Sequence, residues 1–411
     1  MTNKTDSCIT YVSGKAYDLS NFEHKHPGGV DLIRLSYDTD ATAMIHSYHK
    51  DPEKIFKILA SFDIDSDMTP TCPIKFQSDF LTVLKKRIDN YFETSGKNRR
   101  GGLLIRTAAL SFATLLFYYL ALDISWLFSP FFGVCLACIG LCIHHDANHG
   151  AYSRLPAVNH FVGLTGDLIG SSSLIWRYYH CQSHHVNCND VMQDEDTKVG
   201  LPLFRLHSSQ PRYGYMKFQH LYTFLLYALI GIAAPFSSMF EFIKRKHGDV
   251  KLNTISTKNR IEFWVMKLIY FGYMFFIPFY ILGFSFIWKF YLPAQLIGGL
   301  YLGTLFATNH NNNKVLESSQ KNTADWAERQ IITSANWASD SVLWNIFSGG
   351  LNCQIEHHLF PSISHRHYPA LQHIVKKTCD EYSIPYNNFS TFREILVDHF
   401  WFLRKLGQAA H

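Results

Sequence analysis

Histidines are the residues of this chain best suited to chemistry, because there are 22 of them and they gather at a few places. The first cluster reads HHDANH over residues 144–149. Its His145 and His149 are four residues apart, so both imidazoles share one face of a helix. His144 points away from that face. One helical turn therefore offers two ring nitrogens to a metal ion.

Two further clusters repeat this arrangement. One reads HCQSHH over residues 180–185, and the other reads QIEHH over residues 354–358. In each, two side chains with helical spacing share a face, and another histidine lies beside them. With an isolated histidine in the triplet NHN, these segments add the candidate site residues His180, His184, His185, His310, Gln354, His357 and His358.

The number of histidines indicates which metal they bind. Imidazole suits iron, copper, zinc and nickel, so the ligand type alone does not decide. Eight histidines are too many for one tetrahedral zinc ion and suit two irons with open positions. A lone histidine at a helix end usually serves a structural purpose. We expect this of His160, His207 and His220, which have no partner at helical spacing.

Side chains near the clusters are expected to support the metal ligands. A carboxylate can accept the second N–H of a metal-bound imidazole and so fix its tautomer. Trp176 either lines a substrate channel or anchors the chain at a membrane interface. The candidates for the supporting position are Asp146, Asp194, Asp196 and Glu356, of which Asp194 and Asp196 could equally be solvated loop residues.

A second centre is predicted near the N-terminus, where the sequence reads His26-Pro27-Gly28-Gly29. The glycines let the chain turn tightly and approach a flat ligand, which leaves His26 to point into a pocket. A second axial ligand should follow as His46 or His49, and we favour His49. Two neutral imidazoles on one haem iron form an electron-transfer site with no open position for O2. The alternative is a surface turn without haem.

Long apolar segments must hold these histidines in place. Apolar residues make up 47% of the chain and charged residues only 17%, a balance that favours a membrane protein. Helices of about 20 residues cross a bilayer. The apolar segments comprise residues 102–122, 126–143, 221–240, 261–288 and 291–308. We expect one tight turn at residues 123–125 and another at Lys289 and Pro293, so that two hairpins form.

The histidine clusters can meet only if an even number of crossings separates them. We therefore expect residues 221–240, which contain Gly231 and Pro235, to lie in or near the membrane plane. Four spans with both termini in the cytosol remain. Positive charges then gather on the cytosolic side, as in other membrane proteins. They are Arg99, Arg100, Lys244, Arg245, Lys246, Lys258 and Arg260.

The expected fold is mainly α and has three parts. Residues 1–66 form a small α+β module, and residues 67–102, with Pro70 and Pro73, form a linker and a membrane-approach helix. Residues 103–411 form the four-span bundle of two hairpins, whose histidine-rich cytosolic cap includes residues 359–411.

Other features of the sequence narrow the possibilities. The nine cysteines are dispersed, which indicates free thiols on a reducing face, and Cys135 and Cys138 are expected to pack between helices. No basic stripe interleaved with aromatic residues suggests nucleic acid. The N-terminal residues show no charged-then-apolar leader, so we expect an internal span to direct the chain to its membrane.

These motifs together resemble a known family. HPGG followed by DATAMIHSYH is similar to cytochrome b5, although the module starts late, at Cys8. HDANH, HCQSHH and QIEHH, in that order with membrane hairpins between them, resemble the front-end fatty acid desaturases. Gln354, which opens the third motif, is the mark of that family, and the resemblance covers nearly the whole chain.

The resemblance implies cofactors, partners and a reaction. Haem b would be held by His26 and His49, and two irons by the eight clustered histidines, with Gln354 nearby and Asn309 or Asn311 reaching iron through a water. Electrons would pass from NADH through NADH-cytochrome b5 reductase to the haem and then to the irons. With O2, these would remove two hydrogens from a fatty acyl chain carried on CoA or on a phospholipid. The implied location is the endoplasmic reticulum membrane.

The resemblance also implies where the new double bond is placed and which other functions the same scaffold could perform. Front-end enzymes insert a cis double bond between an existing one and the carboxyl end, as in Δ5 or Δ6 desaturation. A sphingoid long-chain-base desaturase of the Δ8 type, a hydroxylase and a conjugase would share this scaffold. A membrane haem relay would not need eight clustered histidines. A metal transporter should carry ionisable residues in the middle of its spans, whereas these histidines lie at the ends.

Overall fold

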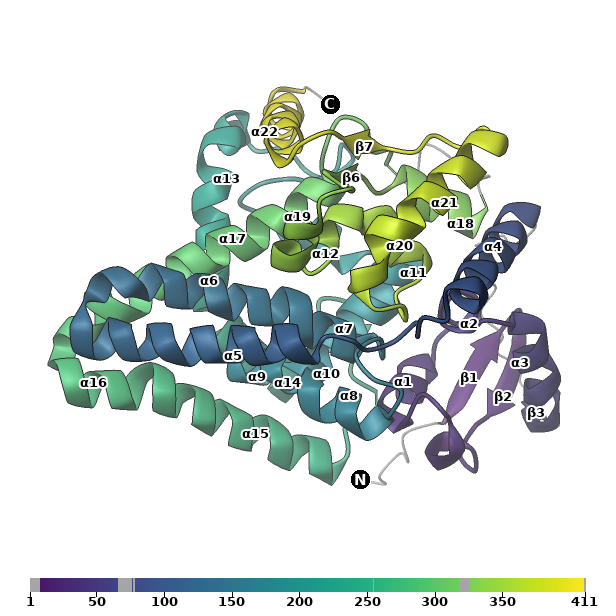
Figure 1. Ribbon diagram of the computed structural model, residues 1–411, viewed down its shortest axis with the longest axis horizontal. Helices are drawn as coiled ribbons and strands as arrows, with labels where there is room; N and C mark the ends of the chain where they lie inside the picture. Colours follow the sequence, from purple (N-terminus) through teal and green to yellow (C-terminus); the bar gives the residue numbers. More distant parts are fainter. Residues whose placement is uncertain (1–7, 66–75, 77, 254, 318–324, 410–411) are drawn as a thin grey trace.

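The computed structural model describes residues 8–65, 76, 78–253, 255–317 and 325–409. A small domain with strands is followed by a layer of long apolar helices and by a helical cap (Figure 1). This is the mainly α architecture that the sequence predicts. Pro70, Cys72 and Pro73, which belong to the expected linker, lie outside the described residues.

The N-terminal domain combines a three-stranded antiparallel sheet with short helices. Its strands follow the order β1 (Ile9–Val12), β2 (Lys15–Asp18) and β3 (Asp63–Ile64). Its α-helices are α1 (Val30–Ile33), α2 (Thr42–Tyr48) and α3 (Pro52–Leu59). The core of this domain continues into the rest of the chain, because Tyr37 and Ile45 belong to the same buried cluster as Trp176 and Phe263.

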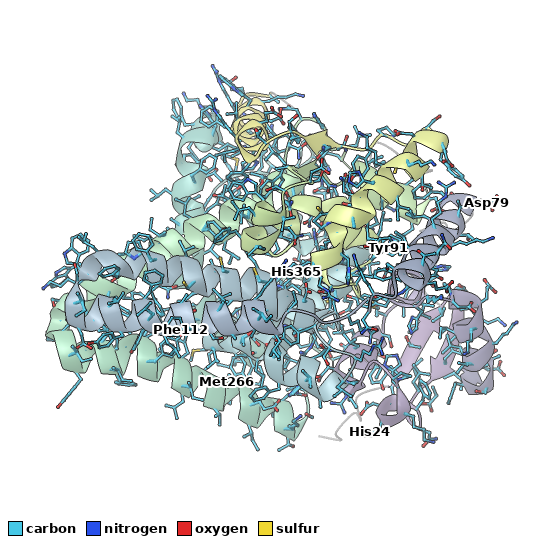
Figure 2. All side chains as sticks on the ribbon, in the orientation of Figure 1. His24, Asp79, Tyr91, Phe112, Met266 and His365 are labelled. Atoms are coloured by element: carbon cyan, nitrogen blue, oxygen red, sulfur yellow. The ribbon has the colours of Figure 1, made fainter. Side chains whose placement is uncertain are left out.

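Four helices in the described part of the chain are long and apolar enough to cross a membrane. They run over Leu104–Ile124, Trp126–Asn148, Thr257–Ser285 and Ile287–His310. The outer faces of the first and third carry exposed apolar side chains such as Phe112, Leu115 and Tyr280. Such a surface is costly in water and is expected against lipid. Figure 2 labels Phe112 and Met266 on two of these helices.

The spans form the two hairpins that the sequence predicts, but the second turn lies elsewhere. The chain reverses at Gly283, whose φ of 57° suits glycine. Lys289 and Pro293, where we expected the turn, lie in the π-helical turn η11 (Ile287–Tyr291) and in α17 (Leu292–His310). That prediction was wrong because the helix already begins at Ile287 and continues through both residues, with Pro293 just after the π-helical turn.

The fifth apolar segment is bent. The helical run Gly214–Ala228, whose last part is α13 (Gln219–Ala228), and α14 (Ile230–Lys244) meet at an angle of 69°. The bent pair is either one broken span or a re-entrant segment, so the placement of residues 221–240 in or near the membrane plane stays a prediction.

The cap brings segments from both ends of the chain together. Its larger helices are α4 (Asp79–Ser95), α18 (Trp326–Ile332), α19 (Val342–Ser348), α20 (Gln354–Leu359), α21 (Tyr368–Glu381) and α22 (Phe392–Gln408). Phe80 and Leu84 of α4 are buried in one cluster with Leu359 and Leu371 of the cap. The buried face of α4 thus packs against protein. His365, labelled in Figure 2, lies where the cap meets the spans and contacts Asp146 at 2.9 Å.

An ion-pair network fixes the N-terminal domain to the helices. Asp31 of α1 accepts a hydrogen bond from Nδ1 of His160, in α8 (Pro156–Gly163), at 2.6 Å and lies 3.6 Å from Arg177. Nε2 of His160 lies 3.0 Å from Glu262 and 3.3 Å from Lys258. The hydrogen bond to Asp31 raises the pKa of His160. In turn, Arg177 and His160 lower the pKa of the Asp31 carboxyl despite its burial.

Docking of the N-terminal domain should therefore weaken at alkaline pH. Docking raises the pKa of His160, so the stabilisation that protonated His160 gives to docking is complete at pH values below its ordinary pKa. This stabilisation is lost as the pH rises through the raised pKa. A hydrogen bond between charged groups contributes about 1.5–3 kcal/mol. The protection of α1 and α8 from hydrogen exchange, relative to the intrinsic exchange rate at each pH, should fall as pH rises in the natural protein, while D31N should lack this protection at every pH. D38N, at an exposed position, is the matched control, and an unchanged D31N profile would contradict this assignment.

Candidate metal centre

The eight predicted metal ligands, seven from the three clusters together with His310, meet inside the protein. They come from α7 (His145–Asn148) and the residue after it, the π-helical turn η7 (Arg177–His184), α11 (His185–Asn187), the end of α17, and α20. Each of the eight predicted metal ligands is buried, with at most 7% of its surface exposed. Segments far apart in sequence thus converge, as predicted.

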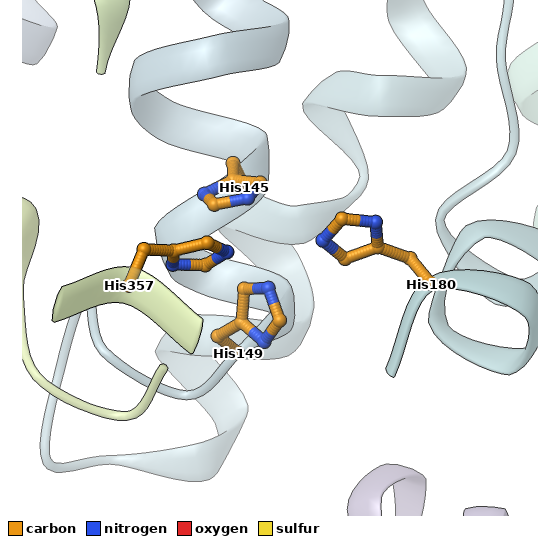
Figure 3. Close-up of side chains that lie close together, drawn as sticks. All are labelled: His145, His149, His180 and His357. Atoms are coloured by element: carbon orange, nitrogen blue, oxygen red, sulfur yellow. The ribbon is translucent and has the colours of Figure 1, made fainter. Parts of the chain in front are cut away.

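The first group consists of His145, His149, His180 and His357. One ring nitrogen of each lies within 4.8 Å of the others, and Figure 3 shows the four rings turned toward a common centre. Nε2 of His145, His149 and His357 is buried without a hydrogen-bond partner. A buried nitrogen without a partner is unfavourable, so these atoms indicate a missing cation.

The second group consists of His184, His310 and His358. Nε2 of His358 and Nε2 of His310 are 3.2 Å apart. Two nitrogens bound to one metal at about 2.0–2.1 Å would have a similar separation. Cys188 lies close to this group, but its Sγ faces Nδ1 of His310, on the far side of that ring.

His185 lies between the two groups. Its Nε2 is 3.1 Å from Nε2 of His180, and its ring centre is 4.6 Å from that of His357 and 4.5 Å from that of His358. The consecutive residues His357 and His358 therefore point toward different groups, because neighbouring side chains on a helix point about 100° apart. His180 and His184, expected on one face, belong to the first and second groups respectively, and with Asp196 they also form a third set of close ligand atoms that joins the two groups.

In several of these rings the outer nitrogen, the one that faces away from the group, contacts another protein group. Such partners fix the tautomer and leave the other nitrogen for a metal. The pairs formed by Nδ1 are His184 with Asp194 at 3.0 Å, His310 with the Thr333 carbonyl at 3.0 Å, His357 with the Tyr368 hydroxyl at 3.4 Å, and His358 with Gln330 Oε1 at 2.8 Å. Thr333, Gln330 and Tyr368 were missed in the sequence because they lie outside the clusters.

Two of the expected supporting carboxylates serve other partners. Asp146 binds His365, and Glu356 accepts from Asn336 Nδ2 at 2.7 Å and from the Tyr386 hydroxyl at 2.9 Å. Their prediction as partners of the clustered histidines was wrong, because adjacent residues on a helix point in different directions. Asp194 and Asp196 do contact His184, the latter at 3.4 Å.

Gln354 and Asn309 form a polar link beside the second group. Nε2 of Gln354 is 2.9 Å from Nε2 of His310, while its Oε1 accepts from Asn309 Nδ2. Asn309 also accepts from Trp337 Nε1, so protein groups occupy both ends of its amide. Asn311 donates to the Ala307 carbonyl. His144, as expected, faces away and contacts the Gly163 carbonyl at 2.9 Å.

Burial keeps most of these rings neutral. It lowers the pKa of His149, His180, His185, His357 and His358. The neutral form is the one that binds metal. In His184 burial also lowers the pKa, but Asp194 and Asp196 outweigh it and raise the pKa to about 9. Converging neutral imidazoles with held outer nitrogens fit a pair of metal ions.

An apolar cavity of about 310 Å³ reaches this centre. Its wall includes His145, His180 and His184, and it continues past apolar side chains. Trp176, one of the lining residues, stacks on His180 with the ring centres 4.1 Å apart. The apolar wall is completed by Ile169, Leu206, Ile230, Ala234, Leu302 and Phe306. An extended hydrocarbon chain suits such a lining.

The N-terminal domain holds a second pair of facing histidines. The rings of His26 and His49 have their centres 6.2 Å apart, which leaves room for one iron with two metal–nitrogen bonds of about 2 Å. Nδ1 of each ring lies 3.2 Å from a backbone carbonyl, of Gly29 and Ile45 respectively. A Cβ at Gly28 would lie 2.8 Å from His26 Cε1, so a side chain there would displace the ring. These residues fit a haem.

The other candidate, His46, faces elsewhere. Its ring stacks on Phe76 with the centres 4.1 Å apart and nearly parallel planes. Lys85 of α4 donates to the backbone carbonyls of His46 and His49 and so supports the end of α2. The geometry therefore favours His49 as the partner of His26.

Comparison with known proteins agrees with both centres. A model of the fatty acid desaturase family matches residues 124–390, a range that contains all the clustered histidines. The chain belongs to this family. A model described as the cytochrome b5-like haem and steroid binding domain matches residues 1–66. The desaturase is thus an oxidoreductase of the di-iron type with a fused cytochrome b5-like domain, and it is a multi-pass membrane protein.

Several relatives align along nearly the whole desaturase. An acyl-lipid (7-3)-desaturase of Chlamydomonas reinhardtii is 34% identical over 96% of this chain and 80% of its own length. An acyl-lipid (8-3)-desaturase of Physcomitrium patens is 33% identical, with 98% of this chain and 89% of that protein covered. The Delta(5) fatty acid desaturase A of Dictyostelium discoideum is 30% identical, with 98% and 92% covered.

Proposed function

We propose that the desaturase inserts a cis double bond into a polyunsaturated fatty acyl chain, between an existing double bond and the carboxyl end. The observation that carries this proposal is the apolar cavity whose wall is formed partly by the clustered histidines. When bound, two irons supply the O2-dependent oxidation that removes two hydrogens from an unactivated chain. The protein holds the acyl chain in the cavity and excludes water.

The roles proposed for the residues follow from their contacts. The two irons would be held by His145, His149, His180, His184, His185, His310, His357 and His358, and haem b would be held by His26 and His49. The amide of Gln354 lies beside Nε2 of His310, the nitrogen left for iron, and Asn309 orients that amide. Pro27, Gly28 and Gly29 shape the haem pocket within residues 1–66, ahead of the linker (67–102) and the membrane part (103–411).

The substrate carrier, electron donor and location are proposed from the family. Relatives named acyl-lipid desaturases support an acyl chain carried on a membrane lipid over one carried on CoA. The fused cytochrome b5-like domain supports NADH-cytochrome b5 reductase as the donor. Basic residues beside the spans support a topology with both termini in the cytosol, in the endoplasmic reticulum membrane.

Feeding experiments test the reaction directly. The desaturase should be expressed in a host that lacks polyunsaturated lipids, with candidate fatty acids supplied. Mass spectrometry should locate a new double bond on the carboxyl side of an existing one, in lipid-bound chains first. New double bonds only in supplied sphingoid bases, or no product although iron and haem are present, would overturn the proposal.

The cavity predicts a pair of contrasting variants. Ala234 lines the apolar cavity, whereas its neighbour Ala233 is exposed and does not line it. A tryptophan adds a bulky ring, so A234W should fill the space needed by the acyl chain and lower product formation at least tenfold. A233W should retain activity because its ring faces outward. Iron and haem contents should be equal in both, and equal product from both would exclude this cavity as the acyl site.

A further inference from the structure

A side chain from the haem domain reaches the metal centre. The hydroxyl of Tyr48 lies 2.7 Å from Nδ1 of His149, although the two residues are 101 positions apart. Their rings are stacked with centres 6.2 Å apart. The other outer partners of the clustered histidines described above come from the desaturase domain, so Tyr48 differs from them in origin.

Tyr48 is also the direct neighbour of a haem-facing histidine. Helix α2 ends at Tyr48, and His49 has an extended backbone with φ −105° and ψ 137°. Consecutive side chains at such a helix end diverge, so Tyr48 points to His149 while His49 points to His26. A path therefore connects the ring of His49 with the ring of His149. It follows covalent bonds from His49 to the Tyr48 hydroxyl and then crosses one hydrogen bond to His149.

The hydrogen-bond direction fits a metal-binding role for His149. Its Nε2 is buried without a partner and faces the first group. The neutral ring then carries its proton on Nδ1 and donates it to the Tyr48 oxygen. Sγ of Cys181 also lies near the same ring nitrogen, 3.6 Å from Nδ1 of His149, farther than the Tyr48 hydroxyl. Tyr48 thus fixes both the tautomer and the orientation of His149.

We propose that Tyr48 couples the two centres: it positions His149 and provides the path by which electrons leave the haem. In each transfer one electron leaves the reduced haem and one enters the metal pair, and no bond of Tyr48 is made or broken. Two such transfers per double bond match the electron demand of the reaction. This inference rests on the proposed function, which assigns His49 to haem and His149 to iron.

Surrounding contacts hold Tyr48 in place for this purpose. Asp31 pairs with His160 and Arg177 across the same domain boundary, and Asn253 donates to the Tyr37 carbonyl at 2.8 Å. Lys85 supports the end of α2 from the other side. A haem domain fixed at several points can keep one hydrogen bond to the metal centre in a constant geometry.

The variant Y48F tests the proposal, because it removes the hydroxyl and keeps the ring. Full-length protein with both cofactors should be reduced anaerobically and mixed with O2 and a lipid substrate, while the haem absorption is followed. Iron retention should fall by about 10- to 100-fold, the usual effect of losing an outer partner of a metal ligand. Haem reoxidation per bound iron should also be slower, because the hydrogen bond that connects the two centres is gone. The haem spectrum itself should be unchanged.

Y368F provides the matched comparison. It removes the hydroxyl beside His357 without touching the haem domain, so it should lower iron retention as Y48F does but slow haem reoxidation per bound iron less than Y48F does. Equal reoxidation rates in Y48F and the natural protein would overturn the coupling and leave the proposed function intact. A natural protein that holds no iron or no haem would instead overturn the proposed function.

Discussion

Replacing His184 with alanine is expected to abolish product formation and to leave the haem spectrum intact. His184 is buried in the second group, 4.8 Å from the ring centre of His310 and 4.9 Å from that of His358. Loss of an outer partner of a metal ligand costs roughly 10- to 100-fold in affinity or activity, so loss of the ligand itself should cost more. Product analysis with iron and haem determination measures the effect.

Two further variants give this prediction its controls. D194N keeps the shape of the outer partner of His184 but removes its charge, so activity should fall about 10- to 100-fold without vanishing. H220A removes a histidine outside both groups, and both cofactors and activity should be retained. Simultaneous loss of iron and haem in H184A would contradict two separate centres.

Local spacing made the metal centre predictable from the sequence. His145 and His149 repeat at helical spacing, and the adjacent pair His357 and His358 places two rings on one short helix, α20. Such patterns are set by the geometry of the backbone and survive any arrangement of the surrounding helices. Seven of the eight candidate ligands could therefore be named from their spacing, whereas the isolated His310 was named from its place just past the last span and from the family resemblance. The structure brings all eight together.

Contacts between distant segments were not predictable in this way. Gln330 lies 28 residues before His358, and Tyr48 lies 101 residues before His149. Neither belongs to a repeating pattern, because only the packing of the cap and of the haem domain brings them to the centre. The division of the histidines into two groups was hidden for the same reason. Glu356 was misassigned because its proximity in sequence does not determine its direction.

The reversal at Gly283 illustrates a different limit. Proline and lysine often mark a turn between two apolar segments, so Lys289 and Pro293 were reasonable candidates. Apolar residues continue through this region, and hydropathy alone does not show where one helix ends. The positive φ of Gly283 marks the break, but a glycine in an apolar segment serves equally well for close helix packing.

Replacing His49 should separate the electron supply from the oxidation chemistry. H49A is expected to lose its bound haem or to leave the iron with one axial ligand, because His26 then has no facing ring. NADH-driven product formation should fall by at least the factor expected for losing an outer partner of a metal ligand, which is about 10- to 100-fold. The iron content should remain that of the natural protein, since the clustered histidines are unchanged.

H46A is the appropriate control because the two histidines lie on the same short segment. His46 stacks on Phe76 and turns away from His26, so its loss should leave the absorption spectrum of the haem in place. A spectrum lost in H46A and kept in H49A would reverse the assignment of the axial ligand. The comparison also distinguishes an enzyme from a relay. In a haem relay iron would be dispensable, whereas here H184A and H49A should each stop turnover while sparing the other cofactor.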